Sequence, residues 1–247
     1  MKLKRFEKMT KTEIAVFFLM AVASGVVIGI GGVSSLLSVS LFGSWGRLIG
    51  GALFSLGIYA IVTFEMRLFT GMVADIPTLG LKNCWRLVVC FLCNGLGVAI
   101  VAVLAYYSPV SEAIVPQAQA LIGTKLAADN WAVKTFCSAV LCGVLITLSV
   151  KSVKFAPQKG LSATVGVIFP IVVFAFCGFD HSVANMLYFY YLGQCSWQIV
   201  GYILISILGN VVGGVALPLV ILLKNRAVQK SIENECAQEK GVEKTES

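Results

Sequence analysis

Charged side chains are scarce in this sequence, and that scarcity excludes an ordinary soluble domain. Only 13% of the 247 residues are charged, whereas a soluble domain carries about 25%. Hydrophobic residues make up 58%, and the mean hydropathy is +0.89. Several long runs contain no charged side chain, the longest being residues 182–223, and a helix needs roughly 20 residues to cross the hydrocarbon core. The composition therefore predicts an all-α integral membrane protein.

Histidine is rarer still, because His181 is the only one in the chain. The eight cysteines do not cluster, apart from the pair Cys90 and Cys93 within one apolar segment, and we interpret them as packing residues. A metal site needs several convergent ligands, so we predict no metal and no cofactor. An enzyme using Asp180 and His181 as an acid–base pair would lack a nucleophile constellation, so we predict that the chain is not an enzyme.

The apolar segments predict six membrane-spanning helices. We expect them at residues 13–38, from 47, 84–108, 131–152, from 161 and 197–224. Residues 106–130 are expected to form one long outer loop. The chain then divides into a basic N-terminus (1–12), a transmembrane domain (13–224) and a polar tail (225–247), which we interpret as an exposed extension or a frayed helix.

The 19 basic residues are unevenly distributed over these loops. With six crossings, the termini and the loops that hold Lys82 and Lys151 fall on one side and carry most of them, whereas the opposite loops carry only Arg47 and Lys125. The positive-inside rule then places both termini in the cytoplasm, and we expect the chain in the cell inner (plasma) membrane. The net charge of +7 therefore reports topology and not a nucleic-acid partner.

Two apolar segments are interrupted by similar polar stretches. "FEMRLFTGM" (64–72) follows the start of the second segment, and "FDHSVANM" (179–186) follows the start of the fifth. Three spans per half make the halves enter the membrane in opposite directions, which predicts an inverted 3+3 repeat with helices 2 and 5 broken near the midplane. Unwound backbone at that depth is tolerated only against protein or a water-filled cavity, so both breaks should face one central path.

The second break holds the one side chain there whose ordinary pKa is near neutrality. The ordinary pKa of histidine is about 6.5, so His181 can take or give a proton at physiological pH. Beside Asp180 and Asn185 we favour that role over a histidine satisfied by a backbone carbonyl. Thr70 is expected at the matching place in the first break, where its hydroxyl can donate to an anion and accept from an acid.

The two breaks also carry charged and bulky apolar side chains. Intramembrane charges are costly and usually paired, so we expect Arg67 to form an ion pair with Asp180 or Glu65. Candidate apolar constrictions near the breaks are Leu68, Phe69 and Phe174.

The residues at the two breaks resemble a known family. "GGALFSLGIYAIVTFEMRLFTG" and "FPIVVFAFCGFDHSVANM" are similar to the two signature regions of the formate/nitrite transporter family, and the similarity extends over most of residues 13–224. The resemblance implies an aquaporin-like protomer with helices 2 and 5 broken, in a homopentamer with one pore per protomer within the lipid bilayer. It also implies passage of small monovalent anions or their acids: formate, nitrite, hydrosulfide, and sometimes acetate or lactate.

The resemblance also assigns polar site residues. His181 corresponds to the family's central pore histidine, and Thr70 to the threonine facing it. A family lysine before helix 4 raises the positive potential near the histidine. Its counterpart is Lys125, which requires a two-residue insertion, or Lys134.

Apolar constrictions carry over in the same way. Leu68 and Phe174 correspond to the outer hydrophobic constriction. Phe54 and Ile58 correspond to the inner one, with Ile146 as a weaker third member.

The chain departs from the family pattern at three places. The family usually has an acid before Leu-Phe-Thr, where this chain has Arg67, with Glu65 two residues earlier. The position after Thr-Gly is often Asn and here is Met72, and the helix 4 motif has Gly143 where Asn is common. These departures leave the preferred anion open.

The expected mechanism follows from the cost of moving charge through apolar surroundings. A bare ion pays a prohibitive desolvation cost that a neutral acid avoids, yet an acid of pKa about 4 is only about one part in a thousand protonated at pH 7. We therefore expect His181 to supply or relay a proton while Thr70 orients the anion. The alternative is an aquaporin-type channel for neutral solutes, although the sequence contains no Asn-Pro dipeptide.

Overall fold

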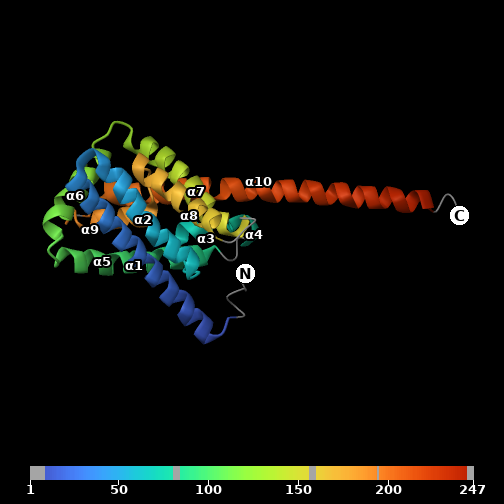
Figure 1. Cartoon of the computed structure of the whole chain (residues 1–247), viewed down its shortest axis with the longest axis horizontal. Helices are drawn as coiled ribbons and strands as arrows, with labels where there is room; N and C mark the ends of the chain where they lie inside the picture. Colours follow the sequence, from blue (N-terminus) through green and yellow to red (C-terminus); the bar gives the residue numbers. More distant parts are fainter. Residues whose placement is uncertain (1–8, 80–83, 156–159, 194, 244–247) are drawn as a thin grey trace.

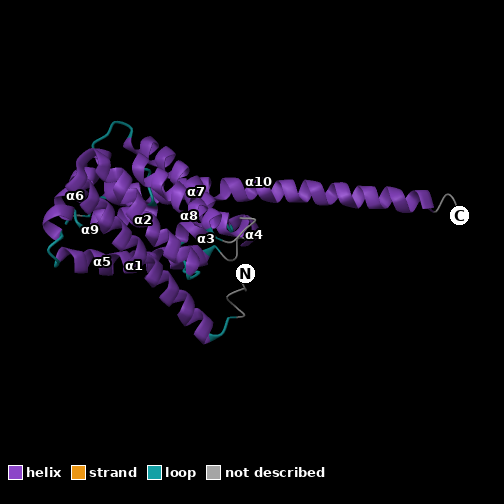
Figure 2. Cartoon of the chain, in the orientation of Figure 1, coloured by secondary structure: helices purple, strands orange, loops and turns teal. Residues whose placement is uncertain are grey.

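The computed structural model describes residues 9–79, 84–155, 160–193 and 195–243 (Figure 1). All regular secondary structure within these ranges is helical (Figure 2). The all-α prediction is therefore confirmed. The elements are α1 (Lys11–Phe42), η2 (Gly43–Trp45), α2 (Gly46–Thr63), α3 (Phe69–Val73), α4 (Ile76–Leu79), α5 (Trp85–Tyr106), α6 (Ser111–Leu126), α7 (Trp131–Phe155), α8 (Leu161–Cys177), α9 (Ser182–Tyr190) and α10 (Trp197–Glu243).

The six predicted helices correspond to α1, α2, α5, α7, α8 and α10, and each begins within two residues of its expected start. The start of α1 has a clear local cause. The Thr10 hydroxyl accepts from Glu13 N at 3.2 Å, and the Glu13 carboxylate accepts from Thr10 N at 2.8 Å. This capping box satisfies backbone donors that a helix N-terminus leaves free.

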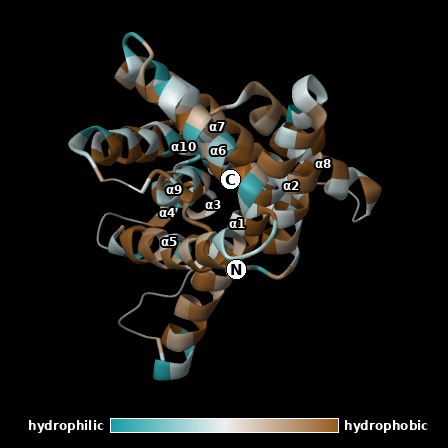
Figure 3. Ribbon diagram, turned by 90° about the vertical axis from the view of Figure 1, so that its left-hand side faces the viewer, coloured by the Kyte–Doolittle hydropathy of each residue, from teal (hydrophilic) through white to brown (hydrophobic). Residues whose placement is uncertain are grey.

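Four helical stretches among the described residues are long and apolar enough to cross a membrane, or five if the bent pair α8 and α9 counts as one span. The first of them, Lys11–Thr63, contains α1 and α2 joined through η2. Most of the length of these helices is hydrophobic (Figure 3), and Leu19 on α1 and Leu92 and Leu104 on α5 are each more than 60% exposed. A helix that is hydrophobic all round is typical of a membrane interior.

The expected outer loop at 106–130 is wrong, because α6 occupies most of it. Ile114, Ala118 and Ile122 recur every four residues on one face of α6, and all three are fully buried. The Gln119 amide also donates to the Tyr191 carbonyl at 2.9 Å, which ties α6 to the end of α9. Pro116 within the segment obscured this helical pattern, although its packing face is regular.

The polar tail continues α10 as helix to Glu243 and projects away from the bundle (Figure 1). Residues 225–234 are exposed along this projection. The expected extension is therefore helical over the part that the structure describes.

The long helices pack as two similar groups. α1 packs against α2 and α5, α7 packs against α8 and α10, and α2 lies against α8. A Cβ at Gly97 of α5 would collide with the Val22 carbonyl of α1, and a Cβ at Gly213 of α10 would collide with the Val140 carbonyl of α7. Glycine at both positions therefore allows the same close helix crossing in each group.

Candidate functional site

The first break separates α2 from α3. Helix α2 ends at Thr63 and α3 begins at Phe69; Phe64 N and Met66 N still donate to Ala60 O and Ile61 O of α2, but the helical ladder is interrupted before α3. The Asn94 side chain on α5 replaces part of it: its Oδ1 accepts from Phe69 N at 2.8 Å, and its Nδ2 donates to Arg67 O at 2.9 Å and to Ala21 O at 2.7 Å. Because an unpaired buried backbone group is costly, Asn94 makes this break tolerable inside the bundle.

The second break separates α8 from α9 with a bend of 48°. Helix α8 ends at Cys177 and is followed by the cap residue Gly178, whose φ of +70° suits glycine. The Asn210 side chain on α10 then satisfies the break: its Oδ1 accepts from Ser182 N at 2.8 Å, and its Nδ2 donates to Asp180 O at 2.9 Å and to Ala139 O at 2.8 Å. We call the contacts of Asn94 and Asn210 the two asparagine brackets.

The two brackets bond equivalent backbone groups, and they define which residues correspond. Phe69 matches Ser182 and Arg67 matches Asp180, so the residue that matches His181 is Leu68. The expectation that Thr70 occupies the place of His181 is therefore wrong, because Thr70 lies two residues farther along.

The sequence reasoning did not single out the two bracket residues. A signal was nevertheless present, since Asn94 and Asn210 are each followed three residues later by a close-packed glycine, Gly97 and Gly213.

His181 and Thr70 still meet, each on a different break. The Thr70 hydroxyl lies 2.9 Å from His181 Nε2, and both residues are about 1% exposed. His181 also caps α9, because its Nδ1 accepts from Ala184 N at 3.0 Å. A neutral ring that accepts at Nδ1 carries its hydrogen on Nε2, so Nε2–H donates to the Thr70 hydroxyl. The hydroxyl hydrogen of Thr70 is then available for another acceptor.

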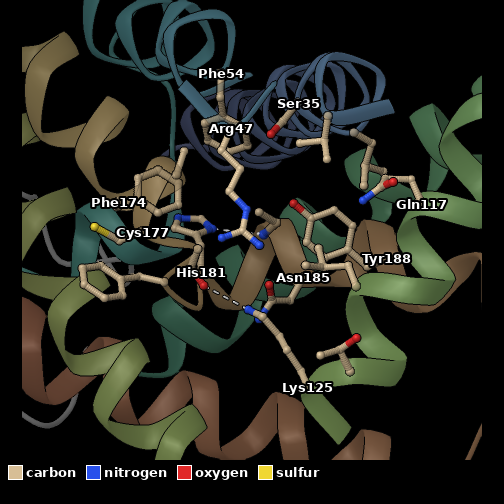
Figure 4. Close-up of a pocket in the computed structure, with 18 of the residues that line it drawn as sticks. Ser35, Arg47, Phe54, Gln117, Lys125, Phe174, Cys177, His181, Asn185 and Tyr188 are labelled. Carbon is tan, nitrogen blue, oxygen red and sulfur yellow. Dashed lines mark hydrogen bonds between the residues drawn. The ribbon is translucent and has the colours of Figure 1, made fainter. Parts of the chain in front are cut away.

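Asp180 forms the charged part of the second break. Its Oδ1 accepts from Lys125 Nζ at 2.5 Å, from Asn185 Nδ2 at 3.1 Å and from the Tyr202 hydroxyl. Lys125 also donates to the Gly178 carbonyl at 3.1 Å (Figure 4). Of the predicted residues, Lys125 and Asn185 therefore belong to one network around Asp180, and Tyr202 is a member that sequence reasoning missed.

This network corrects the predicted ion pair of Arg67 and distinguishes between the two candidate lysines. The expected ion pair of Arg67 with Asp180 or Glu65 is wrong: neither occurs among the described residues, and Lys125 is the ion-pair partner of Asp180. Lys134 is exposed on α7, so Lys125 is the lysine that reaches the second break.

Breaking this ion pair gives a testable result. Lys125→Met leaves Asp180, only 5% exposed, without a cation, and removing one partner of a buried pair costs about 3 kcal/mol. We expect a lower unfolding temperature in detergent. The double variant Lys125→Met/Asp180→Asn should recover most of that loss, because no unpaired charge remains. Equal stability of the wild type and the single variant would contradict the pairing.

A cavity of about 430 Å³, which we call cavity 1, opens on one side of His181 (Figure 4). Its lining residues include Arg47, Phe54, Lys125, Phe174, His181 and Tyr188. The Arg47 side chain points into this cavity and has no ion pair among the described residues.

A second cavity of about 220 Å³, cavity 2, lies beside the first break. Its lining residues include Ile61, Glu65, Arg67, Leu68, Asp75 and Val150. Arg47 lines cavity 1 and Ile61 lines cavity 2, both from α2, and 14 helical residues correspond to about 21 Å. The cavities therefore lie toward opposite ends of α2, with the His181–Thr70 contact between the breaks.

The apolar residues between the two cavities do not form the two constriction pairs that we expected. The ring centroids of Phe54 and Phe174 lie 5.5 Å apart, and both residues line cavity 1. Leu68, by contrast, lines cavity 2. The expected pairs, Leu68 with Phe174 and Phe54 with Ile58, are therefore wrong as groups. Ile58 is fully buried, one helical turn beyond Phe54 on α2.

Two other residues named with the constrictions lie in the core. Phe69 lines neither cavity, and its ring packs on Phe91 at 5.1 Å. Ile146 is fully buried and also lines neither.

Comparison with known proteins gives consistent matches. The profile of the family described as "Formate/nitrite transporter" matches residues 3–223. The chain is 28% identical over 193 residues to "Uncharacterized transporter YrhG" of Bacillus subtilis (strain 168), covering 70% of this chain and 69% of that protein. It is 29% identical over 201 residues to "Probable formate transporter" of Methanothermobacter thermautotrophicus, covering 68% and 71%.

Solved structures share the fold. The structure titled "Pentameric formate channel with formate bound" aligns with a TM-score of 0.71 at 21% identity, over 90% of this chain and 99% of that one. The structure titled "FNT family ion channel" aligns with a TM-score of 0.73 at 23% identity, over 87% and 91%.

Proposed function

This chain belongs to the formate/nitrite transporter family, a family of membrane transporters and not of enzymes, and from that premise we propose that it conducts formate as its main substrate. The observation that carries the proposal is the His181–Thr70 contact, which joins two broken helices between two cavities. Nitrite and hydrosulfide are the next candidates, since all three are small monovalent anions whose conjugate acids are neutral.

We propose six membrane crossings, arranged as an inverted repeat of three plus three. The two asparagine brackets and the matching glycine contacts support this arrangement, because equivalent groups recur in each half. The basic residues of the sequence favour cytoplasmic termini in the inner membrane, so cavity 1 would open to the outside and cavity 2 to the cytoplasm. A homopentamer with one pore per protomer is the assembly we propose.

Cavity 1 would collect the anion by electrostatic attraction. Arg47 and Lys125 both line it, and they are the basic residues that the predicted topology assigns to the outer side. Lys125 is paired with Asp180, whereas Arg47 has no ion pair among the described residues. Clefts lined by one sign of charge raise the local concentration of the opposite ion, so Arg47 provides most of the attraction.

The apolar residues between the cavities would reject a bare ion. Phe54 and Phe174 lie on one side, with Ile58 buried beyond them and Leu68 on the other side. A charged formate loses its hydration there at a large cost, and neutral formic acid does not. Conduction therefore needs a proton at the centre.

The hydrogen bonds of His181 favour a particular proton route. Direct donation by the ring requires a second proton on Nδ1, which would break the bond from Ala184 N. In the route we propose, Nε2–H holds the Thr70 oxygen, the Thr70 hydroxyl donates a hydrogen bond to the anion, and a proton from the bulk solution is relayed through water in cavity 1 to the anion's other oxygen. Neutral acid then passes Leu68.

Flux measurements in proteoliposomes test this function. We expect formate to enter faster than in empty liposomes, and faster as the external pH falls, because the protonated fraction rises. Competition among formate, nitrite and hydrosulfide would rank the substrates. Water and glycerol swelling provides the test of the aquaporin-type alternative: rapid swelling without anion flux would contradict the proposal.

A further inference from the structure

We propose that Arg67 forms a second anion-binding site in cavity 2, on the side of Leu68 away from His181, for a small monovalent carboxylate such as formate. The choice of ligand rests on the proposed function, whereas the site itself rests on the geometry of Arg67. The described contacts of the pore centre do not use the side chain of this residue, although Arg67 lines a cavity at the break.

The backbone of Arg67 is held firmly while its side chain lines the cavity. Arg67 N donates to Met20 O at 3.4 Å, and Arg67 O accepts from Asn94 Nδ2 at 2.9 Å and from Cys90 Sγ at 3.2 Å. These contacts come from α1 and α5, so two long helices fix the backbone from which the Arg67 side chain extends. With the backbone already fixed, only side-chain freedom is lost when Arg67 binds an anion.

The charges around cavity 2 leave Arg67 available. The Asp75 carboxylate pairs with Lys151 Nζ at 2.5 Å, which neutralises one of the two acids that line cavity 2. Glu65 is exposed, Arg67 is half-buried, and no ion pair joins the two among the described residues. Arg67 therefore keeps its positive charge, and it lies in a less hydrated position than Glu65. Its attraction for an anion is stronger there.

The chemistry of the guanidinium selects the ligand class. Its planar fork of donors matches the two oxygens of a carboxylate, and arginine cannot give up its proton at physiological pH. Ile61, Leu68 and Val150 supply apolar walls in the same cavity of about 220 Å³. A small carboxylate fits this combination, with its oxygens on Arg67 and its C–H side against the apolar wall.

The position of the site gives it a role in transport. An acid that has passed Leu68 enters cavity 2, where Arg67 favours the ionised form and so promotes release of the proton to water. In the opposite direction the same guanidinium collects the anion before it meets Leu68. Arg67 thus serves cavity 2 as Arg47 serves cavity 1.

Sided flux tests the proposal. In right-side-out and inverted membrane vesicles, Arg67→Gln should raise the half-saturating formate concentration at least fivefold from the cavity 2 side, and less than twofold from the cavity 1 side. Arg47→Gln should show the opposite preference. Arg226→Gln, an exposed arginine of α10 far from both cavities along the chain, is the matched control and should change neither. Equal half-saturation of Arg67→Gln and wild type from the cavity 2 side would overturn the proposal.

Two further variants keep the test decisive if Arg67→Gln assembles poorly. Arg67→Lys preserves the charge but loses the fork, so its half-saturation should fall between those of wild type and Arg67→Gln. Glu65→Gln removes the competing acid and should lower half-saturation from the cavity 2 side. If neither variant moves the half-saturating concentration in the stated direction, the proposal fails.

Binding measured without transport separates this inference from the proposed function. Line broadening of ¹³C-formate by the detergent-solubilised full chain should weaken in Arg67→Gln and remain in Arg226→Gln. A wild type that conducts no formate but shows Arg67-dependent broadening would contradict the transport function and support the site. Formate flux with no change in broadening or in sided half-saturation would support the function and overturn the site.

Discussion

Replacing His181 by phenylalanine is expected to lower formate flux at pH 7 by about tenfold or more, because the Nε2–H that holds the Thr70 hydroxyl toward the anion is lost and about 1.4 kcal/mol of lost hydrogen bonding corresponds to tenfold in rate. Phenylalanine has a similar ring but no nitrogen, so both the Thr70 contact and the Ala184 cap are lost. Stopped-flow measurement of internal pH in proteoliposomes would give the rate.

His181→Asn separates the two roles of the histidine. Asparagine is a good helix cap and can accept from Ala184 N, but it is too short to reach the Thr70 hydroxyl as the ring does. If His181 acts only as a cap of α9, His181→Asn should conduct like the wild type. We expect instead that it folds like the wild type and conducts like His181→Phe.

The pH profile provides an independent measure of the same mechanism. Between pH 7 and pH 5 the neutral fraction of an acid with pKa about 4 rises roughly tenfold per pH unit. Flux through wild-type protein should rise in the same direction as pH falls, above the leak of empty liposomes. A wild-type flux that is independent of pH across this range would reject proton-linked passage.

Asn210→Leu is expected to have the largest effect on stability. Leucine is close in size but cannot bond Ser182 N, Asp180 O or Ala139 O, so three buried backbone groups lose their contact with the bracket. Each unsatisfied buried group costs about 1–3 kcal/mol, which predicts a total loss of about 4 kcal/mol. We expect a strongly lowered unfolding temperature in detergent and reduced recovery of folded protein.

Matched variants make this test specific to the brackets. Asn94→Leu should cause a similar loss at the first break, because Asn94 bonds the equivalent groups. Asn225→Leu changes an exposed asparagine of the same helix as Asn210 and should have little effect. If Asn210→Leu and Asn225→Leu unfold at the same temperature, the bracket does not stabilise the break.

Much of the fold could be predicted from the sequence because the bilayer imposes simple rules on it. Apolar length fixed the starts of the six long helices, and an acid beside the only histidine marked the second break within the fifth apolar segment. The segment of α6 was missed, since Ile114, Ala118 and Ile122 are spaced among polar residues and a proline. Short amphipathic helices depend on a neighbouring surface to pack against, which a single segment does not reveal.

The sequence identified several residues of the site, but it predicted their mutual contacts less well. The sequence drew attention to His181, Thr70 and Lys125, and the structure brings the first two within 2.9 Å. It also suggested a partner for Asp180, but the wrong one, because an ion pair depends on which helix end reaches the break. Lys125 reaches it from α6, the helix that sequence reasoning did not foresee.

The sequence by itself determined that this chain is a membrane protein with two polar interruptions, since those features depend only on the order and polarity of residues. The tertiary structure decided which groups satisfy the interruptions: Asn94 and Asn210 lie 25 and 28 residues from the amides that they accept from. It also decided that Phe54 joins Phe174 while Leu68 faces the other cavity. Such contacts are set by how helices cross, and the polarity of a segment carries no information about that crossing.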